Sequence, residues 1–590
     1  MYPTADDAQQ PAHESDRSRL AVWREVELLL LVLLVLGVYF ARLTELTIRG
    51  EEPRWARVAQ EMLDSGDYVV PRLQGQPFAD RPPLNSWAMI AAAQLTGRVD
   101  LLAIRLPSVL ATLAVTLLIY VYGRNYLSRG GALAAAASYA TMGQIMALGR
   151  VAESDALVTF LLSAALLAWH AAYDRRRDPR LAWLGGFSLA ALAALAKGPQ
   201  GPVYFTAITV AYLGLRRDWG FLFSRWTAAG LALGIAIVAA WQFPCVLAVG
   251  WKAALLVWTL EGNLAARFQA GSLSRALSHW ATFPLEVFGA MLPWSFMLPV
   301  LSTRWFRQNL GPARPMLTFA ATAFLVAFVT CWLPVESRPR YVMPVYPCVA
   351  LVVGLIIQRS IEAAQVGWWR RSWDNFLVTG VGLIVIAPIA LTLLPSIGGP
   401  RLAVISQANP PAFLIVYGVA AAAAAGVALW SRGGSAQARF VPGFFAIVGF
   451  LGLSYTGPVV NMQVQTCNDP QLAVASIRQK IPAGESLVSF GHVHHLFAYY
   501  YEQPIAFCPV HDDVAPSSSP STYFCFSEDP GFTSPTIPFA WEQVAVISCD
   551  RAKSEHPRAR VIVGRRIPEL ADSRSGEPHA APHAGNPVTR

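Results

Sequence analysis

Apolar runs of membrane length recur along most of the chain and leave little freedom in its fold. A transmembrane helix needs about 20 consecutive apolar residues, and about 13 runs reach or approach that length. They lie near residues 25–44, 103–123, 131–149, 156–173, 181–196, 201–215, 226–248, 283–302, 316–334, 341–358, 375–395, 412–431 and 438–456. Charged residues make only 14% of the chain, against about 25% in soluble domains. The sequence therefore predicts an all-α polytopic membrane protein with about 13 transmembrane helices.

The arginines assign sides to these runs. Cytoplasmic loops of membrane proteins are rich in Lys and Arg, and every second loop here carries at least two arginines if the N-terminus lies in the cytoplasm. The apolar segment 84–97 is too short to span and would invert this pattern, so we expect a helix lying on the membrane surface there. An odd number of spans places the C-terminus outside. Because these loops hold much of the positive charge, the net charge of +9 does not indicate a nucleic-acid partner.

Composition also divides the chain into domains. Residues 1–16, in the cytoplasm, and residues 571–590 are polar and are predicted to be disordered. Between them we expect a transmembrane domain over 17–456, with a first outer loop over 45–102, and a small exported α/β domain over 457–570. The α/β prediction rests on strand-like runs such as SLVSF, VAVIS and RVIVG. Four cysteines of the exported part allow two disulfides in three pairings, or none: Cys467, Cys508, Cys525 and Cys549.

Charged residues gather in the predicted outer loops. The densest cluster is TIRGEEPRWARVAQEML, residues 47–63. Other outer segments are GRVAESD with Asp155, KGPQGP with Lys197, EGNLAARF with Arg267 and ESRPRYVMP with Arg340. Carboxylates deprotonate hydroxyl groups or bind divalent cations, and arginines suit bidentate recognition of phosphate. Together they predict a cavity at the membrane surface that holds a phosphate on a lipid tail and activates an acceptor.

Each segment also has a purely structural interpretation. Charges in a single outer loop usually form a solvated face, and residues 51–62 would make an interfacial helix with i,i+4 pairs. Asp155 would cap the helix that follows it, and KGPQGP would be a simple turn. Arg340 and Tyr341 would anchor a span at the interface. The prediction of a site therefore rests on the joint placement of these segments.

The first outer loop carries an ordered motif. An acidic pair, Glu51-Glu52, precedes Arg54 and Trp55, and SGDY (65–68) and DRPP (80–83) follow. This order resembles bacterial C-type (GT-C) membrane glycosyltransferases of the lipid A aminoarabinose transferase and protein O-mannosyltransferase group. The likeness continues in GRVAESDALVTF (149–160), LAKGPQG (195–201), LPWS (292–295) and SRPRYVMPVYP (337–347). It covers about the first 360 residues.

The resemblance implies a GT-C fold with periplasmic juxtamembrane helices in the bacterial inner membrane. It implies transfer of a sugar from a polyprenyl-phosphate donor to a lipid, protein or glycan acceptor on the periplasmic face, with inversion at the anomeric carbon. The catalytic carboxylates would be Glu51, Glu52 and Asp155. The donor phosphate would be held by Arg54, Arg81, Lys197, Arg267 and Arg340, which would stabilise the leaving charge. Trp55, Asp80 and Tyr341 would complete the site.

Two positions depart from the family pattern. The first acid is usually Asp and here is Glu51, which is one methylene longer, and catalytic geometry is sensitive to shifts of about 1 Å. The usual Lys before the proline pair is Arg81, which keeps the charge but changes the donor geometry. No cofactor is implied with certainty. Parts of the group bind a divalent cation, for which Asp80 is the candidate ligand.

Two other functions fit the same features. A lipid-linked sugar transporter or flippase would also be polytopic, but few ionisable residues lie in mid-span, where coupled transport needs them. A family member that has lost catalysis would explain the departure at Glu51. We expect a transferase, because acids and cations gather on one predicted face of the membrane.

Overall fold

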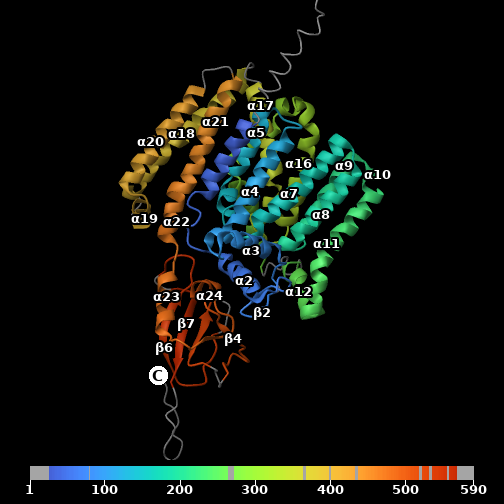
Figure 1. Cartoon of the computed structure of the whole chain (residues 1–590). Helices are drawn as coiled ribbons and strands as arrows, with labels where there is room; N and C mark the ends of the chain where they lie inside the picture. Colours follow the sequence, from blue (N-terminus) through green and yellow to red (C-terminus); the bar gives the residue numbers. More distant parts are fainter. Residues whose placement is uncertain are drawn as a thin grey trace, which may run out of the picture. The chain divides into compact units, whose positions relative to one another are not determined.

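The chain forms two compact units. The computed structural model describes residues 25–567 except 79, 263–271, 363–366, 398–399, 432–435, 517–520, 530–533 and 555–556. The first unit ends at Cys467 and is helical apart from a two-stranded hairpin, while the second begins at Asn468 and contains a sheet (Figure 1). The tails predicted to be disordered, 1–16 and 571–590, lie outside the described residues.

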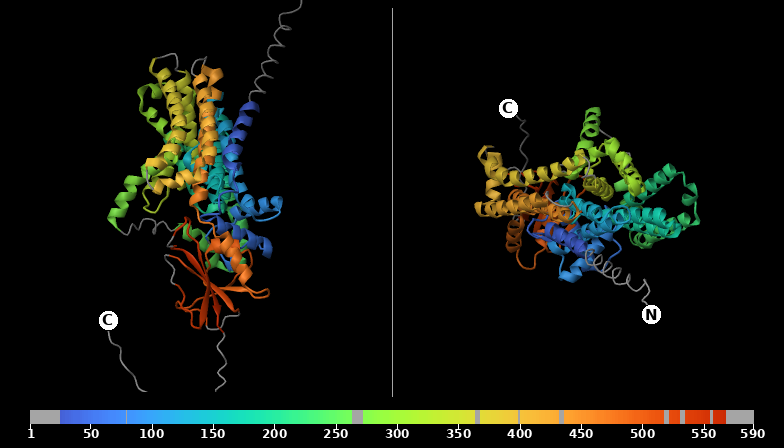
Figure 2. Two further views of the ribbon diagram at one scale, coloured as in Figure 1. Left: turned by 90° about the vertical axis from the view of Figure 1, so that its left-hand side faces the viewer. Right: turned by 90° about the horizontal axis from the view of Figure 1, so that it is seen from above.

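Long apolar helices dominate the first unit and run side by side (Figure 2). Within the described ranges, nine helical stretches are long and apolar enough to cross a membrane. They are α4 (Leu101–Gly123), α7 with η2 (Ser154–Arg176), α8 (Pro179–Lys197), α11 (Arg225–Val249), η4 with α16 (Gly311–Trp332), η6 with α17 (Met343–Glu362), the part Asn375–Ile397 of α18 (Gly367–Ile397), α20 (Pro411–Trp430), and the stretch Phe440–Thr466 across α21 (Ala436–Ser454), η9 (Tyr455–Val459) and α22 (Val460–Thr466). A multi-pass membrane protein follows from this composition.

The remaining predicted spans are shorter or interrupted. The pair α14 (Leu273–Ala290) and η3 (Trp294–Ser302) bends by 112°, where Pro293 cannot continue a helix. Residues 25–35 are helical and continue into η1 (Leu36–Phe40). The run 131–149 is divided into α5 (Arg129–Ala140) and α6 (Gly143–Leu148). Helix α9 (Gln200–Arg216) has 17 residues. The count of about 13 is thus one interpretation of nine uninterrupted helices and these four pieces.

Small residues allow close helix packing in this unit. Helix α5 carries the run Ala132–Ala137, which is fully buried, and α5 packs along α17 (Tyr346–Glu362). A Cβ added at Gly354 of α17 would lie 2.4 Å from the carbonyl oxygen of Gly131 in α5. Helices in membranes approach through such small residues because lipid supplies no hydrophobic force between them.

The first predicted outer loop folds into short ordered elements. Helix α2 (Glu52–Ser65) begins with Pro53 in its first turn and ends at Gly66, whose φ is +70°, as left-handed C-caps require. Glu61 of α2 accepts hydrogen bonds from the backbone nitrogens of Gln74 (2.8 Å) and Gly75 (3.0 Å) in the hairpin of β1 (Arg72–Leu73) and β2 (Gln76–Pro77). Helix α3 (Leu84–Thr96) confirms that the apolar segment 84–97 is helical and too short to span.

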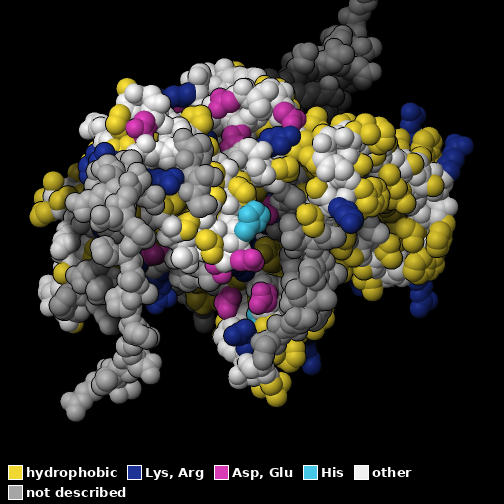
Figure 3. Space-filling view, turned by 90° about the horizontal axis from the view of Figure 1, so that it is seen from below, with side chains coloured by type: hydrophobic (Ala, Val, Ile, Leu, Met, Phe, Trp, Pro, Cys, Tyr) yellow, Lys and Arg dark blue, Asp and Glu magenta, His cyan; other side chains and the backbone are white. Residues whose placement is uncertain are grey.

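Connecting helices complete the first unit. They are α10 (Trp219–Leu222), α12 (Trp251–Gly262), α15 (Arg304–Gln308), η5 (Pro339–Tyr341) and α19 (Pro400–Ala408). Apolar side chains stay exposed on the spans, for example at Val203, Leu215, Ile235, Phe243 and Leu247. Figure 3 shows hydrophobic side chains over the flank where α8–α11 lie in Figure 1. Such a surface suits contact with lipid rather than water.

The second unit is a five-stranded mixed sheet. Its strand order is β4-β3-β5-β7-β6, with β4, β3 and β5 parallel and the other two pairs antiparallel. The strands are β3 (Leu487–Phe490), β4 (Ala506–Cys508), β5 (Tyr523–Glu528), β6 (Trp541–Ser548) and β7 (Arg560–Arg566), with helices α23 (Gln471–Lys480) and α24 (His495–Tyr501). All seven cysteines lie in described parts of the chain and are free, so the structure contains none of the disulfide pairings that the sequence left open.

Candidate active site

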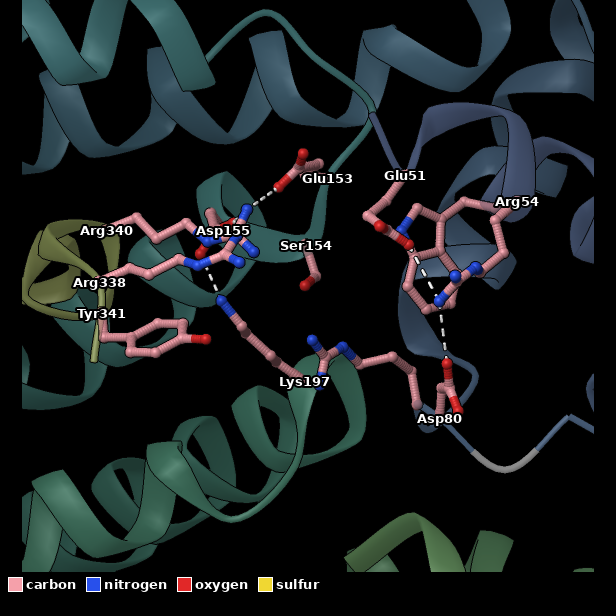
Figure 4. Close-up of a pocket in the computed structure, with 12 residues that line it drawn as sticks. Glu51, Arg54, Asp80, Glu153, Ser154, Asp155, Lys197, Arg338, Arg340 and Tyr341 are labelled. Carbon is pink, nitrogen blue, oxygen red and sulfur yellow. Dashed lines mark hydrogen bonds and ion pairs between the residues drawn. The ribbon is translucent and has the colours of Figure 1, made fainter. Parts of the chain in front are cut away.

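Five segments that are far apart in the sequence meet around one polar cavity of the first unit. The cavity measures about 350 Å³, within the range of small-molecule sites. Its walls come from the start of α2, the turn before α3, the start of α7, the end of α8 and the η5 segment (Figure 4). The lining residues are Glu51, Arg54, Trp55, Asp80, Arg81, Glu153, Ser154, Asp155, Lys197, Arg338, Arg340 and Tyr341. Nine of the eleven residues in the sequence-based prediction line this cavity; Glu52 does not, and Arg267 lies outside the described residues.

Lys197 and Arg340 hold the acids at the start of α7. The ammonium of Lys197 donates to Asp155, and both side chains are about 95% buried. The guanidinium of Arg340 donates to Glu153, and its Nη1 lies 3.7 Å from Oδ2 of Asp155. Buried charges persist in proteins when they are paired and hydrogen-bonded. This half of the cavity is therefore a fixed network of two acids and two cations.

The opposite wall is more open to solvent. Nη1 of Arg54 lies 3.0 Å from Oε2 of Glu51 and 2.9 Å from Oδ2 of Asp80. The side chain of Glu51 is 35% exposed and that of Asp80 is 44% exposed. Figure 4 shows Glu51, Arg54 and Asp80 on one side of the cavity and the pair Asp155–Lys197 on the other. Two of the three predicted catalytic acids, Glu51 and Asp155, thus line the same cavity from opposite walls.

The start of α7 shows why Asp155 is available to this network. The N-cap of α7 is Glu153, which makes no side-chain cap bond, and Asp155 lies in the first turn. The alternative that Asp155 caps this helix is therefore wrong, because its carboxylate turns to Lys197 instead of the backbone. The positive end of the helix dipole still favours an acid at this position.

Burial and neighbouring charges shift the titration of the groups around the cavity. Burial and the neighbouring Asp155 raise the pKa of Glu153 above its usual value. Burial by itself would lower the pKa of Arg340. The negative charges of Asp155 and Glu153 have the larger combined effect and raise the pKa of this guanidinium above its usual value. Burial lowers the pKa of Arg81, although Asp155 opposes this shift. Such perturbed groups in a cleft are typical of functional sites.

Two aromatic residues complete the walls. The ring of Tyr341 lies under the ammonium of Lys197, 5.1 Å from the ring centre, and its carbonyl accepts from Nε2 of Gln200 at 2.8 Å. Trp55 packs edge-to-face on Phe78, with ring centres 5.9 Å apart. KGPQGP, one of the predicted outer segments, is thus more than a turn, because its residues Lys197 and Gln200 contact the η5 segment that carries Tyr341.

Glu52, predicted with Glu51 as a catalytic carboxylate, does not line the cavity. Its side chain is completely buried and accepts from Nε and Nη2 of Arg105, both at 2.7 Å. It also accepts from the backbone nitrogen of Ala152 at 2.7 Å, immediately before the acids of α7. Helix α2 turns successive residues by about 100°, so neighbouring acids face different surroundings. The geometry gives Glu52 a structural position behind the cavity.

Three lining residues were absent from the sequence-based prediction of the site: Glu153, Ser154 and Arg338. Glu153 and Arg338 belong to the outer segments that supplied Asp155 and Arg340, so their charge could have identified them as candidate site residues. Nothing in the sequence indicated that Ser154 would line the cavity. Arg267, predicted to bind the donor phosphate, lies outside the described residues.

A metal ligand set is not evident in the described part of the chain. No group of three or more His, Cys, Asp or Glu side chains there is arranged to hold a metal ion. Asp80, the predicted candidate, pairs with Arg54. A divalent cation therefore stays a prediction.

Comparisons with known proteins agree with this architecture. Residues 80–242 match the family model of dolichyl-phosphate-mannose-protein mannosyltransferases. The chain is 27% identical over 474 residues, 78% of its length and 80% of the relative, to undecaprenyl phosphate-alpha-4-amino-4-deoxy-L-arabinose arabinosyl transferase of Pseudomonas aeruginosa (strain LESB58). The corresponding enzyme of Aeromonas hydrophila subsp. hydrophila is 25% identical over 355 residues, 58% of this chain and 62% of the relative.

A solved structure shares the fold. The crystal structure of ArnT from Cupriavidus metallidurans bound to undecaprenyl phosphate superposes with a TM-score of 0.66 and 18% identity, over 91% of this chain and 97% of that one. These similarities support a C-type (GT-C) membrane glycosyltransferase of the aminoarabinose transferase group. In this glycosyltransferase, the segment matched by the family model holds Asp80, Arg81, Asp155 and Lys197, so it supplies much of the cavity wall.

Proposed function

We propose that this glycosyltransferase takes a sugar from a polyprenyl-phosphate donor and transfers it, with inversion, to an acceptor at the periplasmic face of the bacterial inner membrane. The observation that carries the proposal is the cavity in which Glu51 and Asp155 face each other among arginines and a lysine. The name of the Pseudomonas aeruginosa relative, which includes undecaprenyl phosphate and aminoarabinose, supports this donor class. The solved neighbour with bound undecaprenyl phosphate supports it as well.

The chemistry follows from the charges on the walls. An acceptor oxygen attacks the anomeric carbon of the donor, the bond between that carbon and the phosphate oxygen breaks, and its electron pair leaves with polyprenyl phosphate. Attack opposite the leaving group inverts the configuration. Guanidinium groups of Arg81 and Arg340 and the ammonium of Lys197 offset the charge on the departing phosphate. Glu51, whose side chain is more exposed than that of Asp155, orients or deprotonates the acceptor.

Asp155 has a different part in this proposal. Its carboxylate is tied to Lys197 and lies near Arg340, so it fixes the cations that receive the leaving phosphate. Arg54 and Asp80 perform the same task for Glu51 on the other wall. Fixed charges of this kind stabilise a transition state without reorganising during the reaction.

The topology belongs to the same proposal. We infer 13 spans, a cytoplasmic N-terminus and a periplasmic C-terminal unit, with boundaries near 17–456 for the membrane domain and 457–570 for the exported domain. The arginine-rich loops support the inside assignment. The cavity residues all come from loops assigned to the outer side, which supports one reaction face. The last apolar helix runs to Thr466, which favours a membrane domain that extends past 456.

The experiment uses purified protein with undecaprenyl phosphate bearing 4-amino-4-deoxy-arabinose and an outer-membrane glycolipid acceptor. Mass spectrometry of the lipids should show loss of the donor, free undecaprenyl phosphate and a glycosylated acceptor. A transporter or flippase would leave the donor chemically intact in detergent and only change its leaflet in vesicles. An inactive family member would bind the donor and release nothing.

A further inference from the structure

The break between α8 and α9 brings two side chains to the same neighbour. Lys197 is the last residue of α8 and Gln200 is the first of α9. Gly198 between them has a φ of +108°, a backbone conformation that glycine adopts without steric cost, and Pro199 is the N-cap of α9. The ammonium of Lys197 lies over the ring of Tyr341, and the amide of Gln200 donates to the carbonyl of the same residue. This short turn therefore contacts Tyr341 at both its ring and its backbone.

The carbonyl of Tyr341 needs a side-chain donor, because the backbone nitrogens three and four residues on do not serve it. The donor of a 3₁₀ turn would come from the third residue on, which is Pro344 and has no N–H. The nitrogen of Val345, one residue further, donates to the carbonyl of Val342 at 3.0 Å. Nε2 of Gln200 lies 2.8 Å from the Tyr341 oxygen, a distance typical of a fully formed hydrogen bond.

A second side chain near this carbonyl makes a weaker contact. The hydroxyl of Tyr204 lies 3.5 Å from the Tyr341 oxygen, beyond the usual range of a hydrogen bond, and 2.9 Å from Sγ of Cys331 in α16. The shorter bond from Gln200 therefore holds the carbonyl more firmly. Gln200 does not line the cavity of the proposed active site, so it influences the cavity through the backbone of Tyr341.

Charged and neutral contacts together hold the η5 turn (Pro339–Tyr341). Arg340 pairs with Glu153 of α7, and the ring of Tyr341 lies 5.1 Å from the ammonium of Lys197, as Figure 4 shows for both side chains. Both contacts involve cations that meet the leaving phosphate in the proposed reaction, so their partners change as the donor binds and departs. The bond from Gln200 joins two neutral groups and does not compete with phosphate for a charge. It therefore keeps the backbone of the turn in place while the charged contacts are shared with the substrate.

We propose that Gln200 is a positioning residue of this transferase, whose amide holds the η5 turn so that Arg340 and Tyr341 stay beside Lys197 while the donor phosphate leaves. The proposal rests on the proposed function. Gln200 takes no part in the exchange of bonds and acts through the carbonyl of Tyr341. Position 200 therefore requires a side chain of this length with a neutral N–H donor, and its loss should lower kcat more than it raises the KM for the donor.

Gln200→Met tests the bond itself, because methionine has a similar length and no N–H donor. With undecaprenyl phosphate bearing 4-amino-4-deoxy-arabinose as donor, kcat should fall about tenfold or more, as expected when groups around a reacting centre are displaced. The KM for the donor should stay within about threefold, since Arg81 and Lys197 still meet the phosphate. In an Arg340→Gln background the same substitution should cost about threefold or less in kcat, because residues that act through one another have non-additive effects.

Gln200→Glu provides a measurement that a merely structural role would not change. An ionised carboxylate has no proton to donate and repels the carbonyl of Tyr341, whereas the protonated acid donates its O–H to that oxygen. The variant should therefore be impaired above the pKa of the new acid and recover below it. The ratio of its rate to the wild-type rate should rise about threefold or more from about pH 8 to about pH 5. The titration of Glu153 and of the Asp155–Lys197 pair is common to both proteins and cancels in this ratio.

Gln242 provides the matched control. It is half-buried, its Nε2 donates to the carbonyl of Ala254 at 3.0 Å, and it lies outside the active-site cavity. Gln242→Met and Gln242→Glu should leave kcat within about twofold of wild type at each pH. The two Met variants should have similar midpoints of thermal unfolding in detergent. If Gln200→Met does not fold, the pH dependence of Gln200→Glu still decides, because it compares one folded protein with itself.

Three results would overturn the positioning role and leave the proposed transferase intact. They are a wild-type kcat in Gln200→Met, an undiminished cost of this substitution in the Arg340→Gln background, and a pH-independent rate ratio for Gln200→Glu. A wild-type protein that never consumes the donor would instead remove the proposed function, and this inference with it.

Discussion

Arg105 of α4 donates from Nε and Nη2 to the two carboxylate oxygens of Glu52, each at 2.7 Å, in a site from which solvent is almost absent. Nη1 of the same guanidinium donates to the carbonyls of Leu43 (2.7 Å) and Leu46 (2.9 Å). Glu52 also accepts from the backbone nitrogen of Ala152. One ion pair therefore joins four parts of the chain: residues 43–46 after η1, helix α2, helix α4 and the segment just before α7. The spacing of Glu51 and Asp155 depends on this junction.

Breaking this pair should be costly. Glu52→Ala or Arg105→Ala leaves one buried charge without its partner, which typically costs about 3–5 kcal/mol. We expect a lower midpoint of thermal unfolding in detergent for either single variant. The double variant Glu52→Gln/Arg105→Gln should recover part of the lost stability, because it contains no buried charge without a partner. Equal melting of the single variants and wild type would contradict the structural role assigned to Glu52. Arg98→Ala is the control for loss of an exposed arginine.

Close packing of α5 on α17 gives a second prediction. A methyl group at Gly354 would lie 2.4 Å from the carbonyl oxygen of Gly131, so Gly354→Ala forces the helices apart. Overpacking of this kind costs about 1–3 kcal/mol. Gly418→Ala in α20, where a Cβ meets no atom within 4 Å, is the matched control and should be neutral or slightly stabilising. Thermal unfolding of both variants measures the difference, and similar values would argue against this packing.

Activity should decline toward acid pH because of Glu153. Burial and Asp155 raise the pKa of Glu153, so it gains a proton at a higher pH than an ordinary glutamate. It is ionised above that pKa and holds Arg340; below it the ion pair is lost and the rate should fall. In Glu153→Gln the group cannot titrate, so kcat/KM should be lower at neutral pH and its acid limb should move to lower pH. An acid limb at the same pH in both proteins would assign the limb to another group. Glu45→Gln, at a half-exposed side chain outside the cavity, should leave the profile unchanged.

The length of the Glu51 side chain provides a fourth prediction. Its carboxylate lies 3.0 Å from Arg54, and Glu51→Asp would withdraw it by about 1 Å, a shift that costs up to about 100-fold in rate. We expect kcat to fall by about 10–100-fold while the KM for the donor changes little. A wild-type rate in Glu51→Asp would mean that the exact reach of this acid is unimportant.

The sequence was sufficient for the helical membrane fold and for most of the cavity. Runs of apolar residues specify helical spans because a backbone in the bilayer can form hydrogen bonds only within the protein. The charged residues that line the cavity come from segments predicted to be outer loops. The short helix at 84–96 was predictable for the same reason. The 17 residues of α9 and the break between α5 and α6 were not, since local breaks depend on packing with neighbours.

The different positions of the two neighbouring acids could not be predicted from the sequence. Glu51 and Glu52 have the same chemistry, and only the orientation of α2 and the position of Arg105 send one to the cavity and the other into the interior. The different contacts of Arg338 and Arg340 could not be predicted either. Only Pro339 separates the two arginines, but the ion pairs of Arg340 depend on where Glu153 and Asp155 lie in space.

The most direct measurement is single-turnover release of undecaprenyl phosphate from its aminoarabinose conjugate by wild type, Glu51→Gln and Asp155→Asn, with donor binding measured in parallel. If two acids on opposite walls of one cavity carry the reaction, both variants should still bind the donor and release the lipid phosphate at least about 100-fold more slowly. Release at the wild-type rate by either variant would contradict the account.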